Sequence, residues 1–273
     1  MCPMNPRLLR PTPTGFDPRR IAGAFAWYDA SQPARVTLNG SNVSEWQDII
    51  GGRHLSQATA ANQPAYTTAG QNGRNCITYT STGGRALRAA TAADWEFLHD
   101  GSSLWGIYLV ASCDSVGGSG AANAYLSSYS VSASTYNLRG IAMWHDFGGI
   151  AANNNIRFTI SSSAGLVARR DLSATGAGTT RAYEVLGDPA NATSSSRLSF
   201  KNQAGTTAGN TNGTTTAEAG TAGGAFTVGN TSTGTPFQHA GKICELIVYK
   251  RSTAITATES TAILEYLKKK WAL

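Results

Sequence analysis

The C-terminal stretch from residue 237 to 273 constrains the fold most, because it combines a buried strand with a helix. The segment Gly241–Lys250 is apolar at most positions, and Glu245 is its single acidic residue. This pattern is typical of a strand that is covered on both faces. After a turn, Thr256 and Glu259 have the spacing of a capping box, in which the two side chains satisfy the first backbone amides of a helix.

The helix that this capping box begins has one apolar stripe. Ile263, Leu267 and Trp271 recur at intervals of four residues, with Leu264 beside them. The lysines of Lys268–Lys270 follow in the last turn, where cations interact favourably with the helix dipole. We therefore expect the chain to end in a helix that is docked on a sheet, with Trp271 buried.

The rest of the chain predicts an all-β domain. The Asn39–Gly40 pair indicates a hairpin turn, and Ala92–Leu98 indicates one or two helical turns. Two inserts of low complexity, residues 114–124 and 203–224, are predicted as loops. The predicted strands cover residues 21–30, 43–48, 75–80, 102–112, 141–146, 156–161, 166–171, 181–186, 197–202, 225–229 and 241–250. Many short strands separated by turns favour a sandwich.

Two separated motif blocks carry a resemblance to a known family. The N-terminal block comprises Ala26–Ser31 (AWYDAS), Val43–Asp48 (VSEWQD), Gly51–His54 (GGRH) and Gln57–Pro64 (QATAANQP), and the C-terminal block comprises GKICELIVYK and YLKKKWAL. Together they resemble the LamG-like modules of the concanavalin A-like lectin/glucanase superfamily. The resemblance implies a concanavalin A-like jelly-roll β-sandwich over residues 21–273, with a short C-terminal helix.

An extended N-terminal arm, residues 1–20, precedes this domain. Its five prolines exclude a regular helix. The segments Met4–Pro11 and Gly15–Arg19 resemble the leaders of such modules in phage virion proteins. Two apolar and two basic side chains could anchor the arm to a partner, namely Arg7, Leu8, Leu9 and Arg10. Two interpretations stay open, an anchoring arm and a disordered leader.

Composition argues against nucleic-acid and membrane partners. Charged residues make up 14% of the chain, against about 25% in typical globular domains, so Ser, Thr, Asn and Gly must dominate the surface. The net charge of +6 arises from basic residues spread over both ends rather than over one module with interleaved aromatics. No apolar run reaches the roughly 18 residues that span a membrane, and no secretory signal is apparent. We expect synthesis in a bacterial host cytoplasm and assembly into a virion.

The sequence predicts no enzyme and no catalytic residues. Glucanases of this fold use an E-x-D-x-E ladder on one strand, and the chain has no such triplet. Asp94 and Glu96 have the spacing of two of its members, but Trp95 and Phe97 around them favour a helical turn. No G-x-S-x-G nucleophile turn is present either.

Neither a structural metal nor another cofactor is expected. The four cysteines form no C-x-x-C pair and lie at positions 2, 76, 113 and 244. Calcium remains an alternative, with Asp29 and Asp48 as candidate ligands. However, the segment Ile49–Gly52 lacks the Ser and Asn oxygens that the resemblance leads one to expect there. We therefore expect Asp48 to cap its turn instead.

The candidate ligand or interface patch is Trp144, His145 and Asp146, an aromatic side chain with polar neighbours. The alternative is that Trp144 and Ala142 alternate into the core. The favoured function is that of a non-enzymatic phage virion structural protein, a capsid decoration or surface appendage subunit attached through the arm to other virion proteins and to copies of itself. The alternative is a carbohydrate-binding module of a tail fibre or cell-surface protein, with glycans as partners.

Overall fold

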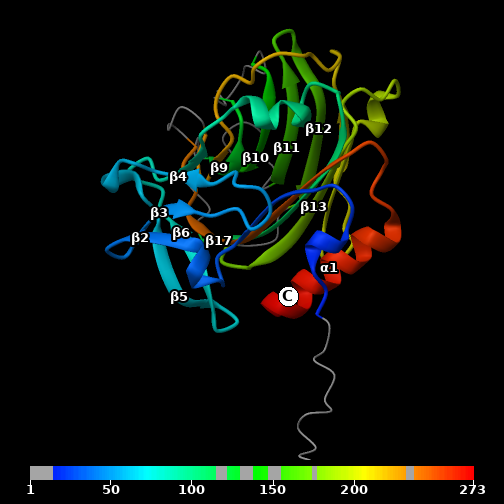
Figure 1. The fold of residues 1–273 in the computed structure, drawn as a ribbon. Coiled ribbons are helices and arrows are strands. Elements are labelled where there is room, and N and C mark those ends of the chain that lie inside the picture. The colour runs from blue at the N-terminus through cyan, green and yellow to red at the C-terminus, as the bar shows by residue number, and fades with distance from the viewer. Residues whose placement is uncertain (1–14, 115–121, 130–137, 147–154, 174–176, 232–236) are drawn as a thin grey trace, which may run out of the picture.

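A computed structural model describes residues 15–114, 122–129, 138–146, 155–173, 177–231 and 237–273, and these form a jelly-roll β-sandwich with one C-terminal helix (Figure 1). The predicted fold class is confirmed. The strands are β1 Ala24–Asp29, β2 Val36–Asn39, β3 Asn42–Trp46, β4 Leu55–Ser56, β5 Ala65–Gln71, β6 Arg74–Tyr79, β7 Leu87–Ala89, β8 Leu104–Cys113, β9 Ala122–Ser127, β10 Gly140–Asp146, β11 Asn155–Ser162, β12 Gly165–Ser173, β13 Arg181–Gly187, β14 Leu198–Asn202, β15 Gly209–Asn212, β16 Thr227–Val228 and β17 Gly241–Arg251. Helix α1 spans Ala257–Trp271, and short 3-10 turns cover Pro18–Arg20, Pro33–Arg35, Ala60–Asn62, Ala93–Leu98 and Ser194–Ser196.

The antiparallel strands form two layers that are joined at one side. The first layer has the order β14-β13-β8-β17-β1. The second has the order β15-β12-β11-β10-β9-β16-β7-β4-β3-β2. Strand β6 pairs with the start of β17 and β5 pairs with β3, so the β5–β6 hairpin connects the layers. The main core lies between the layers and contains apolar side chains from both.

Strand β17 is central, as its apolar sequence predicts. It lies between β1 and β8, and its side chains are buried on both faces. Leu246 and Val248 belong to the main core, whereas Ile247 and Tyr249 belong to a second cluster on the outer face. The two-sided burial explains why polar residues are rare in this strand.

Helix α1 covers that outer face, and its start has the predicted capping box. The Glu259 amide donates to Thr256 Oγ1 at 3.2 Å, and the Thr256 amide donates to Glu259 Oε2 at 2.8 Å. Ile263, Leu267 and Trp271 are each fully buried in the outer cluster. The packing of an apolar stripe gives this helix most of its stability.

The end of α1 is fixed by the β5–β6 hairpin. The last carbonyls of a helix have no partner within it. Here the Gln71 side-chain amide donates to the Trp271 carbonyl at 2.9 Å, while Asn72 and Arg74 donate to the Lys270 carbonyl at 3.1 and 2.9 Å. The hairpin therefore anchors the C-terminal end of the helix, whereas the capping box fixes its N-terminal end.

The described part of the predicted arm, residues 15–20, lies against the sandwich. Pro18 is buried, and its carbonyl accepts a hydrogen bond from the Tyr249 hydroxyl at 3.1 Å. The Phe16 and Tyr266 rings are in contact, with 5.4 Å between their centroids. Figure 1 shows this blue N-terminal segment beside the red helix α1. The anchoring residues Arg7, Leu8, Leu9 and Arg10 lie outside the described residues.

The low-complexity insert 203–224 was predicted as a loop, and this was wrong in part. Its segment Gly209–Asn212 is β15, which pairs with β12 over Ala168–Asp171. Backbone hydrogen bonds hold this strand at the edge of the sheet. Its sequence therefore does not need the alternation of apolar and polar residues by which a strand is usually predicted. Strands β2, β4, β5, β7 and β9 likewise lie outside the predicted strands, and β9 begins within the insert 114–124 that was predicted as a loop.

Other local predictions are confirmed. Ala93–Leu98 forms a 3-10 turn, and Gly40 has the positive φ of 61° that a tight hairpin turn requires. Cys76 and Cys244 are buried as free thiols within strands. Among the described residues, no helix has the length and apolar character needed to cross a membrane.

Candidate functional site

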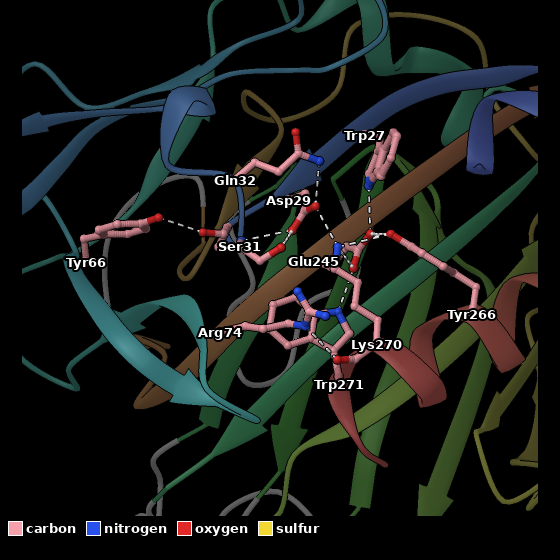
Figure 2. A network of polar contacts seen from close by, with 11 residues as sticks. Trp27, Asp29, Ser31, Gln32, Tyr66, Arg74, Glu245, Tyr266, Lys270 and Trp271 are labelled. Carbon is pink, nitrogen blue, oxygen red and sulfur yellow. Dashed lines mark hydrogen bonds and ion pairs between the residues drawn. The ribbon is translucent and has the colours of Figure 1, made fainter. Parts of the chain in front are cut away.

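The two motif blocks meet in a buried group of polar side chains, here called the carboxylate network. It consists of Trp27, Asp29, Glu245, Tyr266, Lys270 and Trp271 (Figure 2). Asp29 of β1 and Glu245 of β17 are directly opposite each other in the strand register. The Lys270 ammonium lies between the two carboxylates, 2.6 Å from Asp29 Oδ2 and 2.8 Å from Glu245 Oε2.

Glu245 accepts hydrogen bonds from three more side chains. Trp27 Nε1 and the Tyr266 hydroxyl each donate to Oε1 at 2.8 Å, and Trp271 Nε1 donates to Oε2 at 2.6 Å. The side chain is fully buried, yet its lone pairs are occupied by four donors in total. A buried charge is tolerated only when it is paired and hydrogen-bonded in this way.

Asp29 is equally well satisfied. Its Oδ1 accepts from the Ser31 amide at 3.0 Å and from the Ser31 hydroxyl at 2.7 Å, and its Oδ2 accepts from Gln32 Nε2 at 2.8 Å. This Asx-type turn follows β1 directly. With Lys270 also bound, Asp29 serves as a partner of protein donors, which does not favour the alternative of a calcium ligand.

Asp48 caps its turn, as predicted. It accepts backbone amides of Trp27, Ile50, Gly51 and Arg53 at distances between 2.8 and 3.2 Å. The amide of Trp27 belongs to β1, so the turn also fixes this strand. Across the described ranges, no group of three or more His, Cys, Asp and Glu side chains could hold a metal ion.

The electrostatics of the network are those of a structural ion group. Burial raises the pKa of the Glu245 carboxyl, and the Lys270 ammonium acts in the opposite direction. A raised pKa at a cleft is often a sign of acid–base chemistry. Glu245, however, has no exposed surface for a substrate to reach. The arrangement instead fixes α1 to β1 and β17.

A surface cleft of about 780 Å³ opens beside this network, here called the Lys270 cleft. It lies between the N-terminal segment, the turn after β1, the start of β6 and helix α1. Its lining includes Phe16, Gln32, Arg74, Tyr266 and Lys270. The cleft thus combines aromatic rings with amide and cationic groups, which is the composition of a small-ligand site.

The predicted patch of Trp144, His145 and Asp146 is not assembled as one surface. Trp144 is 1% exposed and packs with Tyr129 and Phe237 in a small cluster on the outer face of β9 and β10. His145 follows it in the strand and faces the opposite side, where it is also buried. The side chain of Asp146 lies outside the described residues. Trp144 is buried, but not in the main core that the alternative assumed.

An ion group lies next to Trp144. The Arg157 guanidinium is 5.5 Å from the Trp144 ring centroid, and its Nε donates to Asp171 Oδ1 at 2.8 Å. Arg169 Nε donates to both Asp171 oxygens, at 3.0 and 2.9 Å. Burial alone would raise the pKa of Asp171, but the two arginines outweigh it and hold that pKa below its usual value.

We expect this carboxylate to make stability depend on acid pH. A lowered folded pKa contributes stability that is present above the unfolded pKa of about 3.9 and is lost as the pH falls through the folded pKa. In denaturant titrations between pH 5 and pH 2, the wild type should lose more unfolding free energy than Asp171→Asn. Asp94→Asn, at an exposed position, should keep the wild-type pH dependence. Parallel curves for wild type and Asp171→Asn would contradict this assignment.

Sequence reasoning missed the centre of the network. Glu245 was treated as an interruption of an apolar strand, and Lys270 as a dipole partner within a run of lysines. A lone acidic residue in a strand that is covered on both faces was the available signal, because such a charge needs a buried partner. The sequence contained no indication of which cation would supply it.

Comparison with known proteins supports the fold and does not identify a family. No protein-family model and no curated protein matches the chain. A Trypanosoma rangeli sialidase in complex with the inhibitor DANA superposes with a TM-score of 0.55 and 11% identity over 96% of this chain, which spans 34% of the sialidase. Domain 4 of AbnA, an extracellular arabinanase from Geobacillus stearothermophilus in complex with arabinotriose, superposes with a TM-score of 0.54 and 13% identity, covering 88% of this chain and 98% of that domain.

Proposed function

We propose that this chain is a non-enzymatic structural subunit of a phage particle, either a capsid decoration protein or another surface appendage. The observation that carries the proposal is the carboxylate network. Three charged residues from the two motif blocks meet here: the buried carboxylates of Asp29 and Glu245 both pair with the Lys270 ammonium. The motifs that resemble phage LamG-like modules therefore serve to lock the C-terminal helix onto the sheet.

The absence of a glucanase carboxylate ladder from the described residues supports a non-enzymatic role. Asp94 and Glu96, the pair with suitable spacing, lie in the 3-10 turn Ala93–Leu98 rather than on a strand. Alternate strand residues face the same cleft, whereas residues in such a turn do not. The pair therefore lacks the geometry that retaining hydrolysis needs.

Attachment to the particle should depend on residues 1–14, because Phe16 and Pro18 already belong to the sandwich. Deletion of residues 1–14 should leave the melting temperature unchanged but abolish binding to particles that lack the protein. Replacing all four of Arg7, Leu8, Leu9 and Arg10 by serine should have the same effect, since apolar burial and charge pairing would be lost. Cosedimentation with particles measures the occupancy.

Replacement of Thr12 and Thr14 by serine is the matched control, and it should incorporate like the wild type. Equal occupancy by the wild type and the shortened chain would contradict attachment through this segment. The contact would then lie on the sandwich itself.

A carbohydrate-binding role is the second candidate. The specific observation in its favour is the likeness to domain 4 of the arabinanase, which is covered almost completely and was solved with arabinotriose. The Lys270 cleft adds a described site of suitable composition. Retention on a glycan array, with no change in the glycans after incubation, would support this role.

A further inference from the structure

The Lys270 cleft has a chemistry that selects one class of ligand. We propose that it binds a saccharide that carries a carboxylate, such as a uronic acid. This inference rests on the second candidate function and gives it a site and a ligand class. The cleft volume of about 780 Å³ lies within the range of roughly 300–1,000 Å³ that ligand pockets span.

One side of the cleft is aromatic. The rings of Phe16 and Tyr266 contact each other at 5.4 Å with an interplanar angle of 39°, and both side chains are partly exposed. The Tyr266 hydroxyl is held by Glu245 and by Lys270, at 2.8 and 3.1 Å, so its ring is fixed before any ligand arrives. A rigid aromatic surface of this kind suits the C–H face of a sugar ring.

The other side supplies groups that can distinguish hydroxyls. Ser31, Gln32 and Asp29 line the cleft together, and their side chains are already tied to one another by hydrogen bonds. The Lys270 ammonium, 2.6 Å from Asp29 Oδ2, holds the Asp29 carboxylate in place. Polar groups that are positioned in advance lose little conformational freedom when a ligand binds.

The charge balance of the cleft favours an anion. Lys270 with Asp29 and Glu245 has a net charge of -1, and the acidic residue at the rim, Glu265, pairs with Lys268 at 2.7 Å, so Arg74 and Lys269 bring the balance to +1. Two exposed cations remain, Arg74 and Lys269, and neither has an acidic partner among the residues that the structure describes. Arg74 is fixed by its Nε bond to the Lys270 carbonyl at 2.9 Å. A guanidinium held in this way can bind a carboxylate through its terminal nitrogens.

The test uses the full chain and two matched probes, tetragalacturonate and the neutral tetragalactose, in calorimetric titrations. We expect the wild type to bind the uronate at least tenfold more tightly than the neutral sugar. Arg74→Gln with Lys269→Gln should remove that preference, whereas Phe16→Ala should weaken both probes. Arg20→Gln, which removes an exposed cation outside the cleft lining, should change neither.

Each other outcome is decisive. If the double variant keeps wild-type affinity for the uronate, or Arg20→Gln weakens it equally, the cleft is not the site. If a polyglutamate of equal charge binds the wild type as tightly, the ligand class is an acidic peptide rather than a saccharide. A glycan array could retain the wild type and the cleft variants equally well. That result would support the carbohydrate-binding role but contradict the assignment of the ligand site to the Lys270 cleft. If no saccharide binds, both the carbohydrate-binding role and the cleft assignment are contradicted.

Discussion

Replacing Trp271 by alanine should lower the free energy of unfolding by about 4 kcal/mol, because it empties a fully buried indole site. The indole packs in the outer cluster between α1 and the first layer of the sandwich. Its Nε1 is also one of the four donors to Glu245, at 2.6 Å. Domains of ordinary stability have about 5–15 kcal/mol in total, so the variant should unfold far more easily.

Trp271→Phe separates the two contributions. It keeps most of the apolar contact and removes the hydrogen bond to Glu245, a loss for which we expect a cost of about 1–3 kcal/mol. Urea denaturation gives both values, and Leu38→Ala, at an exposed position, should shift stability by less than about 0.5 kcal/mol. An unchanged midpoint for Trp271→Ala would show that the helix is not docked as described.

Replacing Lys270 by methionine should cost about 3–5 kcal/mol at pH 7, since it leaves two buried carboxylates without their shared cation. Asp29 is 2% exposed and Glu245 is fully buried, so the two carboxylates have little solvent to stabilise their charge once the ammonium is gone. Lys269→Met, the exposed neighbour, should change stability by less than about 0.5 kcal/mol. Denaturant titration of the three proteins checks the contrast.

The deficit of Lys270→Met should shrink in acid. Lys270 lowers the pKa of Glu245 in the wild type, so its removal raises that pKa further. A carboxyl whose folded pKa lies above its unfolded value binds protons more readily in the folded state, and stability then rises as the pH falls towards about 4. Combining Lys270→Met with Glu245→Gln should restore part of the loss at pH 7. A deficit that is independent of pH would argue against a buried charge pair.

Much of the fold could be predicted because local signals and burial agree. The apolar run of β17, the capping box of α1 and its stripe of Ile263, Leu267 and Trp271 each have a pattern that one structure explains. Strand β15 had no such pattern, since backbone hydrogen bonds pair it with β12 and these do not require an apolar residue at any position. Its composition, rich in Gly, Thr and Asn, therefore predicted a loop.

The candidate site was less predictable than the fold, because its parts are far apart in the sequence. Asp29 and Glu245 become neighbours only through the pairing of β1 with β17, and Lys270 reaches them only once α1 has docked. The predicted patch at Trp144 was adjacent in sequence, and strand geometry separates its first two side chains. Adjacent residues of one strand point to opposite faces, so side chains that act together lie across strands or at alternate positions of one strand.

The carboxylate network leads to a simple view of the two motif blocks. They contribute the side chains that fix helix α1 to the sheet, whereas the ligand recognition that we propose lies in the adjoining Lys270 cleft. This separation predicts that cleft variants such as Lys269→Gln alter binding with little effect on stability. Variants of the buried network should alter stability first.

The proposed role on a phage particle can be tested most directly by quantitative mass spectrometry of purified particles. The proposal predicts that peptides of this chain occur in many copies per particle, in constant ratio to the major capsid protein, through density-gradient and size-exclusion steps. A chain that is absent from such particles, or that is lost to trace amounts during purification, would contradict it.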